Sequence, residues 1–310
     1  MRTRALCAVA AAVVLGGCAP YVYKGEINAF AGGVDDLATA YRTGMKGMAS
    51  ERVELQRWQW SVDRPRVALS EDCVVDFKVP AAGPACSVLP SSGKPLPPSA
   101  VETQAAAAAP VVAALRDYAN ALTAVTNAKD AEQLDAAQTK FRGSLQGLLK
   151  QQSVEAPKVG PVVELIGAAF TAVLNERRYK ILRAGVVAAD GPVEQLGKTL
   201  GETLSIMRVA QAGQLKLTAD HMAQQLGPGV GGREYVERLG LVEAKVGMLE
   251  TLRRSDPRRA ADDMVRAHRE LARALADESR QGEAVFEAVI VFSEKAKAVR
   301  TAFGKESKND

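Results

Sequence analysis

Apolar side chains recur every three or four residues along most of this chain, and this spacing constrains the fold more than any other feature. The pattern is longest after Asp256-Pro257. There, two sets of residues lie at multiples of seven: Met264, Leu271, Val285, Phe292 and Val299 in one, and His268, Leu275, Val289 and Phe303 in the other. A repeat near 3.5 residues that persists this long is typical of helices that pack along their length. We therefore predict one last and longest helix here, and an all-α fold for the chain: an elongated antiparallel helical bundle with coiled-coil-like long helices.

Earlier parts of the chain show the same spacing and predict further helices. A first amphipathic helix is predicted from Lys24 to about Trp60, and Pro65 is expected to stop it. The helical pattern resumes near Ser99. Pro110 either kinks this second helix or marks its true start.

Capping and helix-breaking residues indicate where the central helices begin and end. Asp130, with Gln133 three residues later, is typical of a helix N-terminus. Another helix is predicted from Pro161. The trio Asp190-Gly191-Pro192 is expected to stop that helix and to start the next one, which continues to Leu226.

A glycine run, Gly227-Pro228-Gly229-Val230-Gly231-Gly232, matches the letters G-x-G-x-x-G of dinucleotide-binding sites. That fingerprint needs a strand before it and a helix after it, whereas a helical pattern precedes it here. We therefore interpret the run as a linker between helices and predict no cofactor. The helix predicted after it carries an apolar stripe: Leu239, Val242, Val246, Leu249 and Leu252.

Residues 64–100 differ from the rest because proline is dense and the helical spacing disappears. The segment from Cys73 to Val79 has the composition of a strand, and Ala-Ala-Gly-Pro at 81–84 can turn the chain back towards residues 86–89. We predict a small disulfide-stapled β-hairpin or ordered loop inserted between long helices. Such an excursion is either a contact surface or a linker.

The N-terminus has the three regions of an export signal. Arg2 and Arg4 give a positive start, the apolar run Ala5–Leu15 follows, and the small residues Gly16 and Gly17 precede Cys18. Eleven apolar residues are too few for a transmembrane helix, which needs ~20. The segment therefore reads as a signal that is removed.

The four residues Leu15-Gly16-Gly17-Cys18 resemble a lipobox, the cleavage motif of bacterial lipoprotein precursors. The resemblance implies cleavage by signal peptidase II and attachment of lipid, including fatty acids such as palmitate, to the thiol of Cys18. By analogy with Gram-negative lipoproteins, Ala19 implies an outer-membrane anchor facing the periplasm. The chain then divides into four parts: a signal peptide, residues 1–17; a lipidated tether, 18–23; a helical bundle domain, 24–304; and a frayed tail, 305–310.

Two cysteines remain once Cys7 has left with the signal and Cys18 is acylated. An exported protein sits where disulfides persist, so we predict a bridge between Cys73 and Cys86. Two free thiols, or half of a metal site, are the alternatives. No histidine lies nearby and the spacing is not C-x-x-C, so we predict no metal.

Other chemistry-bearing residues are sparse. The two histidines, His221 and His268, are interpreted as one surface residue and one satisfied interior residue, with haem or copper as the alternative. The acidic doublets Asp35-Asp36 and Asp262-Asp263 point about 100° apart on a helix, so neither forms a shared carboxylate site. The later doublet is predicted to stabilise the start of its helix through the helix dipole. Trp58 and Trp60 are either an exposed contact pair or the place where the inserted loop packs.

The charge balance excludes one class of partner. Loss of Arg2 and Arg4 with the signal lowers the basic count from 40 to 38 against 36 acidic residues, a net charge of +2. Nucleic-acid binding usually needs a clustered basic face, so that partner is not expected. With no catalytic constellation, we predict a non-enzymatic structural or interaction protein with an envelope protein as partner. The alternative is a bundle that binds a lipid or a cell-wall fragment.

Overall fold

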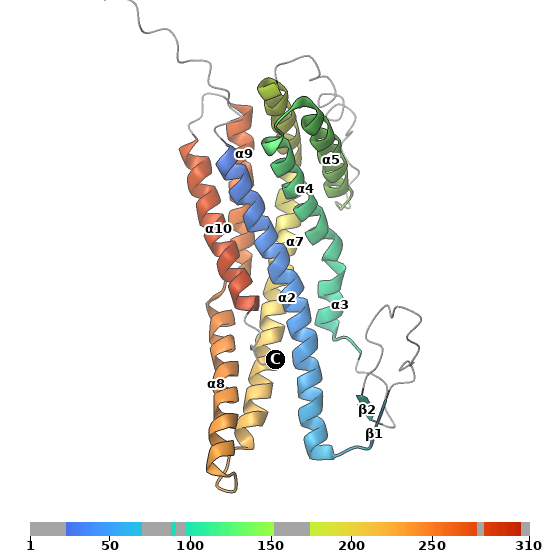
Figure 1. Ribbon diagram of the computed structural model, residues 1–310, viewed down its shortest axis with the longest axis vertical. Helices are drawn as coiled ribbons and strands as arrows, with labels where there is room; N and C mark the ends of the chain where they lie inside the picture. Colours follow the sequence, from blue (N-terminus) through green and yellow to red (C-terminus); the bar gives the residue numbers. More distant parts are fainter. Residues whose placement is uncertain (1–22, 70–87, 91–96, 152–173, 278–281, 305–310) are drawn as a thin grey trace, which may run out of the picture. The chain divides into compact units, whose positions relative to one another are not determined.

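The computed structural model describes residues 23–69, 88–90, 97–151, 174–277 and 282–304. The described chain is almost entirely helical, which confirms the predicted all-α class (Figure 1). Its elements, in chain order, are α2 (Lys24–Asp63), β1 (Val67–Leu69), β2 (Val88–Pro90), α3 (Ala100–Ala107), α4 (Ala109–Asn127), α5 (Ala131–Lys150), α7 (Leu174–Gln224), α8 (Gly232–Arg254), α9 (Pro257–Ala276) and α10 (Glu283–Gly304).

The chain divides into two compact units. Unit 1 comprises Met1–Ala38, Pro110–Gly201 and Arg258–Lys297. Unit 2 comprises Thr39–Ala109, Glu202–Pro257 and Ala298–Asp310. Because α2, α7 and α10 cross these limits, each of them contributes residues to both units.

Local capping explains where the middle helices begin. The Ser99 hydroxyl accepts a hydrogen bond from the N–H of Glu102, whose carboxylate accepts one from the N–H of Ser99, so a capping box starts α3. The break near Pro110 falls at Ala108, between α3 and α4. Asp130 caps α5 by accepting a hydrogen bond of 2.8 Å from the N–H of Gln133, as the sequence predicted.

The predicted helix break at Asp190-Gly191-Pro192 is wrong, because α7 continues through Pro192 as one helix of 51 residues. Ala189 and Val193 are buried on either side of the proline. A proline inside a helix costs about 3 kcal/mol, and burial of the apolar side chains in the flanking turns offsets this. The predicted start of this helix at Pro161 lies outside the described residues.

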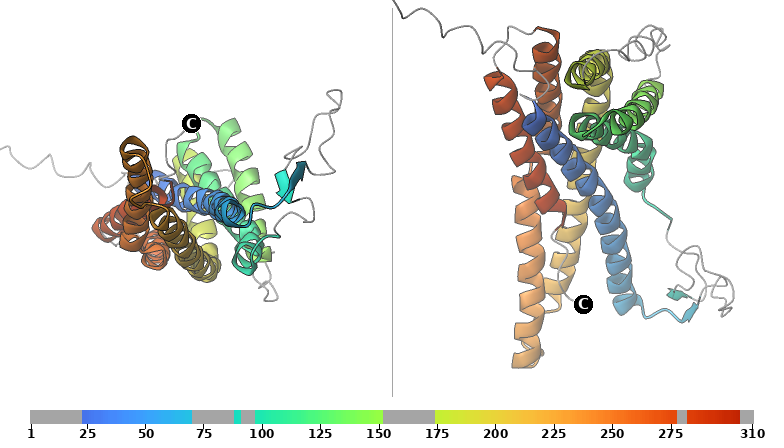
Figure 2. Two further views of the ribbon diagram at one scale, coloured as in Figure 1. Left: turned by 90° about the horizontal axis from the view of Figure 1, so that it is seen from below. Right: turned by 45° about the horizontal axis from the view of Figure 1, so that its top comes forward.

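The predicted single helix after Asp256-Pro257 is also wrong, because it consists of α9 and α10. All nine residues of its two heptad sets are nevertheless buried. A Lys295–Asp263 ion pair joins the two helices, which lie side by side in both views (Figures 1 and 2). The apolar repeat misleads because it keeps its phase from α9 to α10, so that the apolar residues of both helices are buried.

The predicted hairpin is observed in part. β1 pairs with β2 in antiparallel register, with Val67 opposite Pro90 and Leu69 opposite Val88. Both strands fall within the predicted excursion, residues 64–100. The expected strand from Cys73 to Val79 and the Cys73–Cys86 disulfide lie outside the described residues, as does Cys18.

The length and hydropathy of a helix determine whether it can span a membrane. Among the helices that the structure describes, none combines the length and the apolar character that a membrane span requires.

Candidate functional site

His268 is fully buried in unit 1, and both of its ring nitrogens have partners. Nε2 lies 2.8 Å from the Tyr118 hydroxyl, and Nδ1 lies 3.2 Å from Oδ1 of Asp190. His221, by contrast, is exposed in the last turn of α7. The prediction of one surface histidine and one satisfied interior histidine is therefore confirmed.

Burial determines the protonation states of His268 and Tyr118 in this series of hydrogen bonds. Burial lowers the pKa of His268 against the opposing effect of Asp190, so the ring is neutral near pH 7. Burial also raises the pKa of Tyr118 well above its ordinary value, so its hydroxyl keeps its proton. The arrangement that satisfies every atom has Tyr118 donating to Nε2 and Nδ1–H donating to Asp190. The hydrogen bond from His268, and then nearby Arg269 and Arg273, lower the pKa of Asp190.

The surroundings of His268 favour a structural role over a catalytic one. Phe30 packs on the imidazole with ring centroids 5.7 Å apart, and Phe292 lies 5.6 Å beyond Phe30. Phe141 stacks on Tyr118 at 5.8 Å. Tyr118 and His268 are almost completely buried among these rings, whereas the side chain of Asp190 is 33% exposed.

In the second acidic doublet, Asp262 is exposed and Asp263 is buried, and the role expected for this doublet is wrong. Asp263 is buried, and it pairs with Lys295 and, at 3.0 Å, with Arg266. It lies beyond the first turn of α9, which contains no acidic residue, so ion pairing replaces the expected dipole interaction. In the first doublet, Asp35 accepts a hydrogen bond of 2.7 Å from Arg116 on α4.

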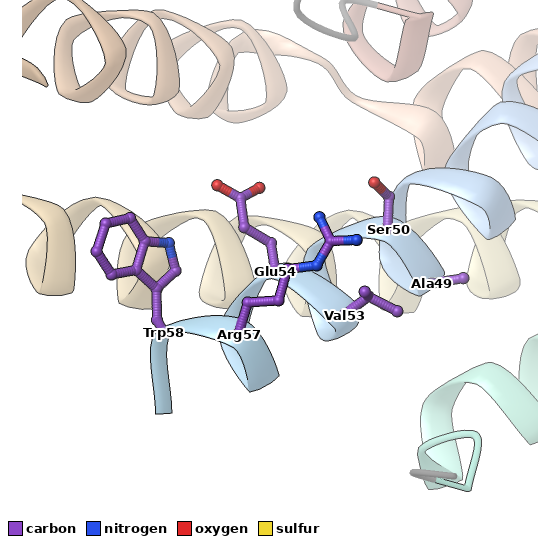
Figure 3. A pocket seen from close by; sticks show the side chains of 6 residues that line it. All are labelled: Ala49, Ser50, Val53, Glu54, Arg57 and Trp58. Atoms are coloured by element: carbon purple, nitrogen blue, oxygen red, sulfur yellow. The ribbon is translucent and has the colours of Figure 1, made fainter. Parts of the chain in front are cut away.

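A groove of about 680 Å³ runs along α2 in unit 2. We call it the α2 groove. The residues that line it are Ala49, Ser50, Val53, Glu54, Arg57 and Trp58 (Figure 3). Ser50, Glu54 and Trp58 lie four residues apart, and Figure 3 shows their side chains on the same side of the helix. Most of the inserted loop, the alternative partner of Trp58 and Trp60, lies outside the described residues.

Lys245 on α8 bridges to α2 beside this groove. Its ammonium group lies 2.7 Å from a carboxylate oxygen of Glu51 and 2.6 Å from one of Glu54. Burial opposes the charge of Lys245, but hydrogen bonds and attraction from the two carboxylates raise its pKa. Glu51 also accepts a hydrogen bond of 3.3 Å from Thr218 on α7. A buried charge cluster therefore holds α2, α7 and α8 of unit 2 together.

Helix α8 buries few of its apolar residues. The sequence predicted a packed stripe here, yet Leu252 is the only buried residue among the 23 of α8. Four residues at spacings of four, three and four share one side of the helix, and we call them the α8 stripe: Tyr235, Leu239, Val242 and Val246. Tyr235 is 39% exposed and Val246 47%, whereas Leu239 and Val242 are half-buried. Neighbouring Val236 is 66% exposed. Figures 1 and 2 show α8 beside the second half of α7, so α7 covers only one face of α8.

The described residues contain no cluster of three or more histidine, cysteine, aspartate or glutamate side chains that could hold a metal ion. The interhelix linker predicted at Gly227–Gly232 is confirmed except for its end, because residues 225–231 join α7 to α8 and Gly232 begins α8. Sequence reasoning missed both the α2 groove and the exposure of α8.

Comparison of the chain with protein-family models, curated proteins and solved structures finds no match.

Proposed function

We propose that this protein is a lipid-anchored, non-enzymatic interaction module of the bacterial cell envelope, and that the α8 stripe is its contact face. One observation carries the proposal: a helix of 23 residues buries only Leu252, and Tyr235 and Val246 of the α8 stripe are exposed while Leu239 and Val242 are half-buried. Soluble proteins seldom expose a contiguous apolar row without a partner for it. The α2 groove, next to the Lys245 bridge, extends the available surface.

The partner that fits this face is an amphipathic helix of another envelope protein. The α8 stripe has the spacing by which two helices pack, and it runs for about three turns. Charged residues of both signs surround it, as in the Arg233–Glu237 and Glu234–Arg238 ion pairs. A mixed border of this kind suits the polar rim of a protein interface and gives no net attraction to an anionic membrane.

The proposal also includes the lipid anchor at Cys18 and the elongated form of the helical domain. The lipobox resemblance supports acylation of Cys18, cleavage after residue 17 and an outer-membrane location facing the periplasm. Two or three acyl chains hold a folded domain at a bilayer almost permanently. The long helices support an elongated antiparallel bundle with coiled-coil-like packing, and the exported location supports a Cys73–Cys86 bridge.

Site-specific photocrosslinking in intact envelopes tests the contact face. A photoreactive residue at Val246 is expected to give one discrete adduct with a protein other than this chain. The same residue at Ala244, exposed on the opposite side of α8, should give little of that adduct. Val236→Asp combined with Tyr235→Asp should abolish the adduct without loss of helical circular dichroism. Equal labelling from both positions, or no discrete adduct, contradicts the proposal.

A second candidate is binding of a cell-wall fragment in the α2 groove. Its volume of about 680 Å³ falls within the range of ordinary ligand sites, and Trp58 offers an aromatic face beside Glu54 and Arg57. Titration with soluble peptidoglycan fragments should then shift the tryptophan fluorescence of the wild type but not of Trp58→Phe. An unchanged wild-type spectrum contradicts this candidate.

A further inference from the structure

A second pocket, of about 300 Å³, lies in unit 1 where the start of α2 meets the α4–α5 connection and the start of the described part of α7. Three cationic side chains line it: Lys24, Lys129 and Arg178. Thr126, Asn127 and Asn175 line it as well, and none of its lining residues is acidic. The pocket therefore combines three positive charges with neutral hydrogen-bonding groups.

Arg178 is the unusual member of this set. Its residue is 6% exposed, yet the described acceptors of its guanidinium are neutral. One terminal nitrogen donates to the side-chain oxygen of Asn175 at 2.8 Å, and the other donates to the backbone oxygen of Ala128. Its Nε is buried, and no acceptor for it lies within the described part of the chain. A buried cation without a carboxylate partner is costly, so an anionic ligand would stabilise it.

Three acidic residues near the pocket in the described chain already have other partners. Asp130 caps α5 through Gln133, and Asp135 pairs with Arg177. Glu176 pairs with Lys180 at 2.7 Å. Each of these carboxylates is therefore already engaged next to the pocket, and none of them lines it.

We propose that this pocket binds a phosphate group. Arginine presents a planar set of donors that matches phosphate oxygens, and lysine adds point charges to the same site. The amides of Asn127 and Asn175 can donate to the remaining oxygens. The Thr126 hydroxyl already donates to the backbone oxygen of Leu122 at 2.8 Å, so it contributes only a polar wall. The group comes either from a phospholipid headgroup or from free phosphate.

The short distance in sequence between Cys18 and Lys24 is the reason to consider a headgroup. Lys24 follows Cys18 by six residues, which span at most about 20 Å when extended. If Cys18 carries lipid, the pocket therefore lies within that reach of a bilayer surface. This choice of source rests on the proposed function, whereas the phosphate site itself does not.

Isothermal titration of the purified full chain at low salt tests the site with two probes: inorganic phosphate, and glycerophosphoglycerol, the deacylated headgroup of an anionic phospholipid. We expect saturable binding of at least one. Arg178→Gln should weaken it by at least about tenfold and Lys129→Gln by about threefold. Lys140→Gln, which removes an exposed lysine of unit 1 outside the pocket, should leave it unchanged.

The outcomes separate the two sources. Tighter binding of glycerophosphoglycerol assigns a lipid headgroup, and binding of inorganic phosphate that is as tight or tighter assigns free phosphate. Absence of saturable binding of both probes overturns the proposal. So does binding that Lys129→Gln leaves unchanged, because this variant removes a surface charge and is not expected to unfold the chain. Fatty-acid labelling of Cys18 decides the anchor independently of these titrations.

Discussion

Tyr118 on α4 and His268 on α9 share a buried hydrogen bond of 2.8 Å between positions 150 residues apart in the sequence. The second ring nitrogen of His268 extends the chain of hydrogen bonds to Asp190 on α7. A polar link of this kind in an apolar core is satisfied only when all three helices hold one register. It therefore specifies the packing of unit 1.

Tyr118→Phe should lower the free energy of unfolding by about 1–3 kcal/mol, because it leaves Nε2 of His268 buried without a donor while keeping the ring. Urea unfolding followed by circular dichroism measures the change. Tyr235→Phe, which removes a hydroxyl on exposed α8, is the matched control and should change stability by less than about 0.5 kcal/mol. Equal stability of Tyr118→Phe and the wild type contradicts the hydrogen-bonded arrangement.

Unit 1 should lose stability as the pH falls below the ordinary pKa of 6.5 for histidine. Burial lowers the pKa of His268 in the folded protein, so the unfolded chain binds more protons in that window. The stability that depends on neutral His268 is complete above pH 6.5 and is lost as the pH falls towards the lowered pKa. The free energy of unfolding falls by no more than about 1.4 kcal/mol per pH unit in that window. The pKa of Asp190 is also lowered, so Asp190 affects the pH dependence of stability only below its ordinary pKa of 3.8.

Melting temperatures of the wild type and of His268→Gln, compared between about pH 7.5 and about pH 5, isolate this effect. The variant should be less stable throughout, but it should depend less on pH across the window. Parallel pH profiles for the two proteins show that His268 is not the titrating group.

Gly185→Ala should destabilise unit 1 by about 1–3 kcal/mol, because a Cβ on α7 would overlap the ring of Phe141 on α5. Gly143→Ala on α5 is the matched control, since its Cβ meets nothing within 4 Å. That variant should instead stabilise its helix by about 0.5–1 kcal/mol. Chemical denaturation of both variants checks the opposite signs, and a stabilising Gly185→Ala contradicts the observed close approach.

Lys245→Met should destabilise unit 2 by about 2–4 kcal/mol, because it leaves the buried carboxylate of Glu51 without its cationic partner. Lys216→Met removes a lysine from an exposed pair with Asp220 and should cost less than about 1 kcal/mol. Thermal unfolding compares the two variants. Similar small losses in both show that the Lys245 bridge contributes little.

The sequence-based predictions succeed where a rule acts over a few residues. The cap at Asp130 depends on a residue three positions away, and the burial of His268 and Phe292 follows from their spacing. They fail at Pro192 because burial of flanking residues outweighs a local preference. The break between α9 and α10 escapes prediction because the apolar repeat stays in phase on both sides of it.

The candidate sites depend on contacts that spacing along the chain does not reveal. Lys24, Lys129 and Arg178 come from three distant segments, so no local pattern indicates that they line one pocket. The spacing of Leu239 and Val242 predicts an apolar face on α8, but not whether another helix covers it. Only the fold shows that Leu239 and Val242 are half-buried while Tyr235 and Val246 on the same face are exposed.

Metabolic labelling with a clickable palmitate analogue tests the central claim, a lipid anchor at Cys18, most directly. The wild-type protein should carry the label and remain with the membrane fraction, whereas Cys18→Ala should carry none and leave that fraction. A wild-type protein that is exported and cleaved but remains unlabelled contradicts the claim.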